Sequence, residues 1–452
     1  MPEAPWVTWL GDDFTGSAAV MEVLHFAGLS SVLFTDIPSP NLAARFAGCR
    51  GVGIATTARS HDPAWMAQNL PVLFGWLDAL RAPILHYKIC STFDSSPDSG
   101  SIGAAIEIGL RVRPAKAVPL LTAAPQMRRY QAFGHLFAGT LDGVFRLDRH
   151  PVMSRHPVTP MPESDLLGHL STQTDLRSAL IDLEALADPQ ALQAALASGA
   201  RILSIDSMEP ASETAAGRLI WENRADLGFV AGSQGVEYAL VRHWQDSGTI
   251  PRVDAPGGLP RAGRIMAVSG SVSPTTARQL DWAGRNGFAL LPFDARAVTG
   301  SDADLAEEER RLTQAAIAAA QAGQSPLVHS ASGEGPQVEA YRTALARSGM
   351  DGTTANRRIG EALGRILDAT LRATGIRRAV ISGGDTSGHG MRQLGLSALV
   401  AKAPTIPGAA LCQAFGSGPH DGLEIALKGG QMGSEDYFGW IRDGGGSKRT
   451  TA

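Results

Sequence analysis

Cysteine is scarce in this sequence, which contains three cysteines in 452 residues and no CxxC pair. Cys49, Cys90 and Cys412 therefore match neither a disulfide framework nor a zinc-binding pattern. We expect a protein of a reducing compartment, the cytoplasm. The first residues carry no basic cluster and no apolar run is long enough to span a bilayer, so we expect neither a signal peptide nor a membrane segment.

An excess of charge of one sign is also missing, because 40 basic residues face 44 acidic ones and leave a net charge of −4. This balance does not favour a nucleic-acid or membrane partner, so local groups must hold any anionic ligand. The apolar content of 44% and the charged content of 19% are typical of a soluble globular enzyme. The length predicts two or three domains.

Two common nucleotide-binding motifs are absent. No GxxxxGK[ST] segment occurs, which excludes an ordinary P-loop. No GxGxxG follows the first predicted strand of either half, which counts against a sugar-acid dehydrogenase that uses NAD. Loops rich in glycine and serine can still bind phosphate through backbone N–H groups.

What the sequence does contain is a repeated order of apolar strand, polar loop and helix. This order predicts α/β domains with doubly wound, mainly parallel sheets. In the first half we expect strands at residues 6–10, 31–34, 52–55, 84–89, 118–121, 201–206 and 228–231. Glycine and proline concentrate before residue 264. The expected organisation is a substrate domain at 1–247, a linker at 248–263, a second domain at 264–443 and a disordered tail at 444–452.

Polar side chains follow three predicted strands of the first half. Asp12 and Asp13 follow the first strand, Arg59 follows the third, and Lys88 ends the fourth. Ligands of such sheets bind at the carboxyl ends of the strands. Two cations that hold a carboxylate, beside carboxylates that accept from hydroxyls, predict a site for a small polyhydroxylated acid. The expected substrate contacts are Asp12, Arg59, Ser60, Lys88, Ile89, Cys90, Ser91 and Thr92.

Structural alternatives exist for these signals. A single aspartate at a helix start is usually a cap, but of Asp12 and Asp13 only one can cap, and the other repels it unless a cation or hydroxyl lies near. Lys88 ends an apolar strand, where a charge without a partner is costly. His150 and His156 lack the spacing of a zinc pair on a helix, so we expect ordinary loop histidines in the irregular segment 143–161.

In the second half, loops of glycine and serine follow predicted strands. Residues 265–269 are an expected strand, and Ser273 is the expected N-cap of a helix that starts at Pro274. A second expected strand at 379–381 runs into glycines, with a helix from about Ser387. Such loops bind phosphate at the positive end of a helix dipole, although a plain turn is the alternative. Asp385 would repel bare phosphate and fits better beside magnesium or a ribose hydroxyl.

Together these motifs resemble the four-carbon acid sugar kinase family over nearly the whole chain. The matching segments lie at residues 11–16, 88–95, 101–103, 156–161, 269–271, 383–387 and 428–430. The resemblance implies an N-terminal substrate domain and a C-terminal ATP domain, with the active site in the cleft between them. The form CSTFDS at residues 90–95 resembles the branch that phosphorylates 3-oxo-tetronates, and the branch acting on the branched acid 3-oxo-isoapionate stays open as an alternative, as do D-threonate and D-erythronate kinases.

The resemblance implies that ATP, with Mg²⁺, phosphorylates the terminal hydroxyl of the acid and gives the 4-phosphate. Asp12 or Asp13 would orient or deprotonate that hydroxyl, and Asp385 is the candidate magnesium contact. The implied ATP contacts are Ser269, Ser271, Gly383, Gly384, Asp385, Thr386 and Gly408.

This chain departs from the family pattern at two places. It has Asp385 where a glutamate is common, and residues 429–433 replace the usual Ser-Gly-Asn-Phe-Gly. A non-catalytic sensor of sugar acids is the alternative from another class of protein, and a homodimer is a further expectation.

Overall fold

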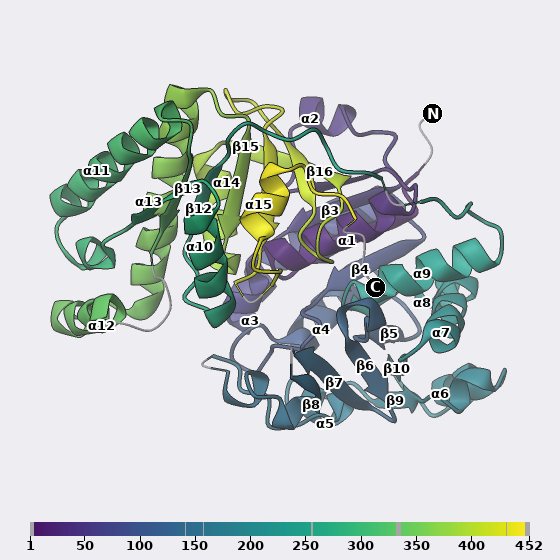
Figure 1. The fold of residues 1–452 in the computed structure, drawn as a ribbon. Helices are drawn as coiled ribbons and strands as arrows, with labels where there is room; N and C mark the ends of the chain where they lie inside the picture. Colours follow the sequence, from purple (N-terminus) through teal and green to yellow (C-terminus); the bar gives the residue numbers. More distant parts are fainter. Residues whose placement is uncertain are drawn as a thin grey trace. The chain divides into compact units, whose positions relative to one another are not determined.

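The computed structural model describes residues 4–140, 142–156, 158–254, 256–330, 336–430 and 432–447, without the side chains of residues 336, 337 and 385. The chain divides into two compact units, Met1–Asp254 and Ala255–Ala452. Each unit combines a mainly parallel sheet with helices (Figure 1). The predicted α/β class is therefore confirmed. The predicted cleft between the domains stays a prediction.

The first unit is organised around a parallel sheet in the order β2-β3-β1-β4-β11-β5-β10-β9. Its strands are short apolar runs, most of them fully buried, as expected for parallel strands that helices cover. The strands are β1 Val7–Gly11, β2 Ser31–Phe34, β3 Gly51–Ala55, β4 Ile84–Lys88, β5 Val118–Leu121, β9 Ser178–Ile181, β10 Ile202–Ile205 and β11 Phe229–Gly232. The helices are α1 Phe14–Phe26, α2 Pro40–Ala44, α3 Pro63–Ala79, α4 Ile102–Val112, α5 Leu166–Leu170, α6 Ala191–Ala197, α7 Pro210–Glu222, α8 Arg224–Leu227 and α9 Gly235–Asp246.

A small antiparallel sheet of the first unit was not predicted. It consists of β6 Arg129–Ala132, β7 His135–Thr140 and β8 Gly143–Arg146. Phe133 and Gly134 join β6 to β7, and both have positive φ. The prediction of an irregular segment at 143–161 is therefore wrong for its first residues, which form β8.

The second unit has the strand order β13-β14-β12-β15-β18-β17-β16. The strands are parallel from β13 to β18, and β17 is antiparallel to both of its neighbours. The strands are β12 Met266–Ser269, β13 Phe288–Pro292, β14 Ser325–His329, β15 Arg378–Ser382, β16 Leu396–Ala403, β17 Leu411–Gly416 and β18 Glu424–Lys428. The helices are α10 Pro274–Arg285, α11 Asp302–Gln321, α12 Pro336–Ser348, α13 Gly352–Thr374, α14 Gly384–Gln393 and α15 Tyr437–Arg442.

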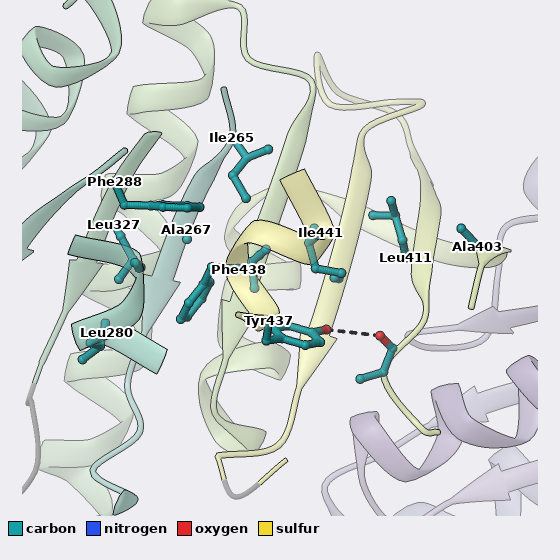
Figure 2. Close-up of a cluster of buried hydrophobic side chains, with 14 residues drawn as sticks. Ile265, Ala267, Leu280, Phe288, Leu327, Ala403, Leu411, Tyr437, Phe438 and Ile441 are labelled. Atoms are coloured by element: carbon teal, nitrogen blue, oxygen red, sulfur yellow. Dashed lines mark hydrogen bonds between the residues drawn. The ribbon is translucent and has the colours of Figure 1, made fainter. Parts of the chain in front are cut away.

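Helices cover both faces of this second sheet. On one face, Ala267 and Val380 belong to an apolar cluster with α10 and α15 (Figure 2). In that cluster the hydroxyl of Tyr437 donates to the carbonyl of Ala409 (3.1 Å). On the other face Ile381 packs so closely against α14 that a Cβ on Gly390 would lie 2.6 Å from its Cδ1. Successive apolar side chains of a strand point to opposite faces of the sheet, so helices pack on both faces and the unit is doubly wound.

The ends of the second unit differ from the prediction. The backbone N–H of Leu259 donates to the carbonyl of Gly444 (2.8 Å), and that of Gly446 donates to Pro404 (2.7 Å). Residues 444–446 are therefore part of the packed unit, so disorder from residue 444 is wrong there, and residues 448–452 lie outside the described chain. Across the described ranges no helix is both long and apolar enough for a membrane crossing.

Candidate functional site

Arg59 joins the two aspartates that follow β1. Its Nε and Nη2 donate to the two carboxylate oxygens of Asp12 (3.0 and 2.7 Å), and Nη2 also donates to Asp13 (2.8 Å). Because β3 lies beside β1, the short turn after β3 carries Arg59 to the same edge of the sheet. The structure thus brings together three of the residues predicted for the substrate site.

The two aspartates differ in their chemistry. Asp13 caps α1, since its carboxylate accepts from the backbone of Gly16 (2.9 Å) and the hydroxyl of Thr15 (2.7 Å). Burial acts to raise the pKa of Asp13, but the charges of Arg59 and Lys88 outweigh it and lower the pKa. For Asp12, burial prevails over Arg59 and raises the pKa. The prediction that only one of the two aspartates caps is confirmed, with Asp13 as the cap, and Arg59 is a cation that lies near the pair.

Lys88 lies against this pair. It ends β4 with 1% of its surface exposed, and its Nζ donates to the carbonyl of Ile89 (2.6 Å). A Cβ on Gly16 would lie 2.6 Å from that Nζ and 2.4 Å from Oδ1 of Asp13, so a glycine is needed where both side chains meet the helix start.

The loop after β4 adds a chain of polar contacts. Sγ of Cys90 lies 3.1 Å from Oγ1 of Thr92, and that hydroxyl donates to Asp94 (2.7 Å). Burial raises the pKa of Cys90, so this thiol is neutral. Phe93 is buried with a φ of 60°, an uncommon backbone conformation for an aromatic residue. Of the other predicted contacts, Ser91 is half-buried, whereas Ser60 is exposed.

Sequence reasoning missed Arg129. This residue begins β6 and pairs with Ala124, just beyond the end of β5. Its Nη1 donates only to carbonyls, including that of Met127 (3.1 Å), and its buried Nε has no hydrogen-bond partner within the described residues. Burial lowers the pKa of Arg129, while the nearby groups of Cys90 and Asp94 act to raise it. Only recognition of the β6–β7 hairpin could have placed this cation at the edge of the sheet.

In the second unit, three buried polar residues stand side by side at the ends of adjacent parallel strands. Ser269 of β12 is in register with Ser382 of β15, which is in register with Lys428 of β18. All three are fully buried. The hydroxyls of Ser269 and Ser382 have no hydrogen-bond partner in the described part of the chain.

The helix after β15 begins earlier than predicted. α14 starts at Gly384 rather than near Ser387, and Gly383 precedes it with a φ of 125°, a conformation that favours glycine. Gly384 and Thr386 therefore lie in the first helical turn. A Cβ on Gly384 would meet no atom within 4 Å, whereas one on Gly270 would lie 2.2 Å from Oγ1 of Thr386. The loops after β12 and β15 thus touch, while Gly384 faces open space.

The start of α10 completes this region. Ser273 is its N-cap as predicted, and the hydroxyl oxygens of Ser271 and Thr276 lie 3.0 Å apart. Gly408 is buried with a φ of 85° in the segment that joins β16 to β17. Because β16 runs parallel to β15, this segment emerges at the same edge of the sheet as Ser382.

The residues at this edge suit a polyphosphate. This edge carries the backbone N–H groups of two helix starts, the two buried hydroxyls of Ser269 and Ser382 and a buried lysine, and all of these can donate to an anion. Among the described residues, no three histidine, cysteine, aspartate or glutamate side chains are grouped so as to hold a metal. A magnesium ion here would depend on phosphate oxygens and on few protein ligands, as is usual for this ion.

Comparisons with known proteins match both halves of the chain. A model of a sugar-binding N-terminal domain matches residues 7–240, and a model of a nucleotide-binding C-terminal domain matches residues 266–438.

Several known proteins are similar along almost their whole length. The chain is 43% identical to a 3-oxo-isoapionate kinase of Paraburkholderia graminis, over 98% of this chain and 95% of that protein. It is 30% identical to a 3-oxo-tetronate kinase of Methylobacterium radiotolerans, over 96% and 98% of the two chains. A 3-oxo-tetronate kinase of Pseudomonas savastanoi pv. phaseolicola is 29% identical over 96% of both.

Solved structures share the fold. A crystal structure from Salmonella typhimurium LT2 has a TM-score of 0.75 at 25% identity, covering 96% of this chain and 98% of its own. A Haemophilus influenzae protein has a TM-score of 0.70 at 21% identity, covering 96% and 99%, and supports the fold alone.

Proposed function

The chain belongs to the four-carbon acid sugar kinase family, and from this premise we propose that it transfers the terminal phosphoryl group of ATP to a hydroxyl of a sugar acid. One observation carries the proposal. The domain matched to sugar binding has carboxylates and cations at its strand ends, and the domain matched to nucleotide binding has buried hydroxyls, a lysine and helix starts at its own. That the two clusters serve one reaction, in a cleft between the domains, is part of the proposal.

We propose 3-oxo-isoapionate as the preferred acid. The 43% identity to a 3-oxo-isoapionate kinase exceeds the 30% identity to a 3-oxo-tetronate kinase by a wide margin over similar coverage. This comparison moves the preference from the 3-oxo-tetronates, suggested by the CSTFDS loop, to the second candidate. A 3-oxo-tetronate remains the next substrate to test.

In the first domain, Arg59 and Lys88 would bind the carboxylate of the acid. Nη1 of Arg59 has no partner within the described residues, while its other nitrogens hold the aspartates. Asp12 would then accept the proton of the attacking hydroxyl or orient that hydroxyl, since its raised pKa makes it the better base of the two aspartates. Asp13 would position Arg59 and the start of α1.

In the second domain, the starts of α10 and α14 and the hydroxyl of Ser269 would bind the phosphates of ATP, with Gly408 and Ser271 at the same edge. When bound, the magnesium nucleotide supplies the phosphoryl group and offsets its charge; Asp385 is the proposed magnesium contact. The protein's contribution is then position and electrostatic stabilisation, the main sources of rate in phosphoryl transfer. A cytoplasmic location and a homodimer stay predictions.

An assay of ADP release over a panel of acids tests the proposal. The panel holds 3-oxo-isoapionate, both 3-oxo-tetronates, D-threonate and D-erythronate, each with ATP and Mg²⁺. We expect ADP and a sugar-acid phosphate, identified by mass spectrometry, to form in equal amounts, with the highest kcat/KM on 3-oxo-isoapionate. ADP release that no acid accelerates would contradict the proposed function, and a higher kcat/KM on a tetronate would contradict only the choice of substrate.

A further inference from the structure

We infer that Lys428 binds the phosphate chain of the nucleotide directly and supplies the positive charge of that site. The inference rests on the proposed function and adds to it a residue and a measurable consequence.

The first argument is the surroundings of Lys428. It is fully buried at the end of β18, and its Nζ donates to the neutral carbonyls of Gly429 (3.0 Å) and Gly430 (3.4 Å). Nζ also lies 5.9 Å from the ring centre of Tyr437. The described side chains form no ion pair with Lys428, and the side chain of Asp385 is not among those described. A buried ammonium without a carboxylate is costly, and an anionic ligand would remove that cost.

The second argument is the row in which Lys428 stands. Residues in register on parallel strands project to the same face of a sheet, so Ser269, Ser382 and Lys428 share one face. Two residues earlier, Ala267 and Val380 lie on that face in the apolar cluster under α10 and α15 (Figure 2). Ser269, Ser382 and Lys428 therefore lie where this face of the sheet leaves the apolar cluster and becomes polar. Two hydroxyls that have no partner among the described residues, beside an ammonium, are the donors that a phosphate requires.

The third argument is the start of α10, which is fastened to the same segment. The hydroxyls of Ser273 and Thr276 both donate to the carbonyl of Gly430 (2.5 and 2.9 Å), which also accepts from Lys428. The ammonium and the first turn of α10, the positive end of a twelve-residue helix, therefore bind the same carbonyl oxygen, that of Gly430. This contact fixes both cationic features relative to each other.

Burial lowers the pKa of Lys428 to about 7. Titratable groups near it are Tyr437 and, further along the row, His329 at the end of β14. The acidic residues before α15 have other partners, since Glu435 pairs with Arg278 (3.6 Å) and Asp436 accepts from Ser434 (2.5 Å). A bound phosphate would raise the pKa of Lys428 again, because an opposite charge favours the ammonium. Nucleotide binding at pH 8 should therefore take up a proton.

Isothermal titration of the full chain with a non-hydrolysable ATP analogue and Mg²⁺ tests the inference. Titrations at pH 8 in two buffers of different ionisation heat give the number of protons taken up. We expect the wild type to take up most of one proton, and Lys428→Arg to bind without uptake because arginine stays charged. Lys428→Met should bind at least about tenfold more weakly, as expected for a lost charge-assisted hydrogen bond, and without uptake. Lys402→Met, at an exposed lysine of β16, is the matched control and should behave as the wild type.

The outcomes separate the inference from the proposed function. Equal proton uptake in the wild type and Lys428→Met, or equal affinity in both, would overturn the role of Lys428 while nucleotide binding stands. No binding by the wild type would overturn the proposed function as well. The Tm of thermal unfolding without nucleotide shows whether a variant has a folding defect. The Tm of Lys428→Met should be at least that of the wild type, because the substitution removes a buried charge.

Discussion

At the scale of single residues, two lysines have the same position in different domains. Lys88 ends β4 and Lys428 ends β18, and both are buried. The cost of a charge after an apolar strand identified Lys88 from the sequence. Lys428 also ends a buried strand, but the glycines that follow it make residues 424–428 look like part of a loop, so the sequence did not identify this lysine. A charged residue at the end of a buried strand indicates a functional site only where the sequence allows that strand to be recognised.

The roles of the two aspartates depend on contacts that a local pattern does not contain. The sequence predicted that only one of them caps and that a cation or a hydroxyl lies near the pair. Which one caps follows from the start of α1 at Phe14, and the choice of cation follows from the pairing of β1 with β3. Arg59 lies 47 positions from Asp12. Only the fold brings them together.

Replacement of Asp12 by asparagine should lower kcat by about 10²-fold or more, because the amide cannot accept the proton of the attacking hydroxyl. The matched control is Asp13→Asn. Asparagine caps a helix as well as aspartate, so this variant should keep the start of α1 and lose less activity, about tenfold, through a weaker hold on Arg59. Steady-state kinetics with ATP and the preferred acid measure both. Equal losses would contradict the separate roles, and wild-type rates would remove both carboxylates from the mechanism.

The pH profile gives an independent check on Asp12. Burial raises the pKa of Asp12 in the free enzyme, and a base must be unprotonated to act. The kcat/KM of the wild type should therefore fall as pH decreases through this raised pKa. Asp12→Asn should lack that acid limb, whereas Asp13→Asn should retain it.

At the scale of elements, the predicted helices were most accurate where a cap residue marks their start. Ser273 and Pro274 fixed the start of α10, which the structure confirms. The start of α14 was placed about three residues late, because Gly383 and Gly384 are poor helix formers and read as a loop. The sheet of β6 to β8 was missed for another reason: its strands are short and only partly buried, so they lack the apolar runs that identified the central strands.

The first turn of α14 is open to test. Gly384→Val should raise the KM for ATP at least about tenfold, since the added side chain would occupy the space in front of a helix start that is proposed to bind phosphate. The free protein should tolerate it, because a Cβ at this position meets no atom within 4 Å. Gly352→Val is the matched control: Gly352 is also the first residue of a helix, α13, and also has open space around its Cα. A KM for ATP that is the same in both variants would place the nucleotide elsewhere.

At the scale of the whole molecule, the alternation of strands and helices predicted two α/β units, and the structure has two. The antiparallel strands β16 and β17 could not be predicted, because the glycine-rich segments around them read as loops. Their effect is to return the chain so that β18 lies beside β15, and this return places Lys428 next to Ser382. The second site therefore depends on a topology that no single motif encodes.

If each unit binds one substrate, a substitution in one unit should weaken the binding of that unit's substrate and leave the binding of the other substrate unchanged. Asp12→Asn should bind the non-hydrolysable ATP analogue with a Kd within about twofold of the wild type, and Gly384→Val should bind the sugar acid equally well, as expected if each substrate is bound by residues of one unit that share no contacts with the other site. Titration calorimetry measures each affinity, and thermal unfolding gives a second readout, because a ligand at 100 times its Kd stabilises the folded state by about 2.7 kcal/mol. Loss of nucleotide binding in Asp12→Asn, or of acid binding in Gly384→Val, would show that one unit does not hold one substrate, and the assignment of the two domains would then be wrong.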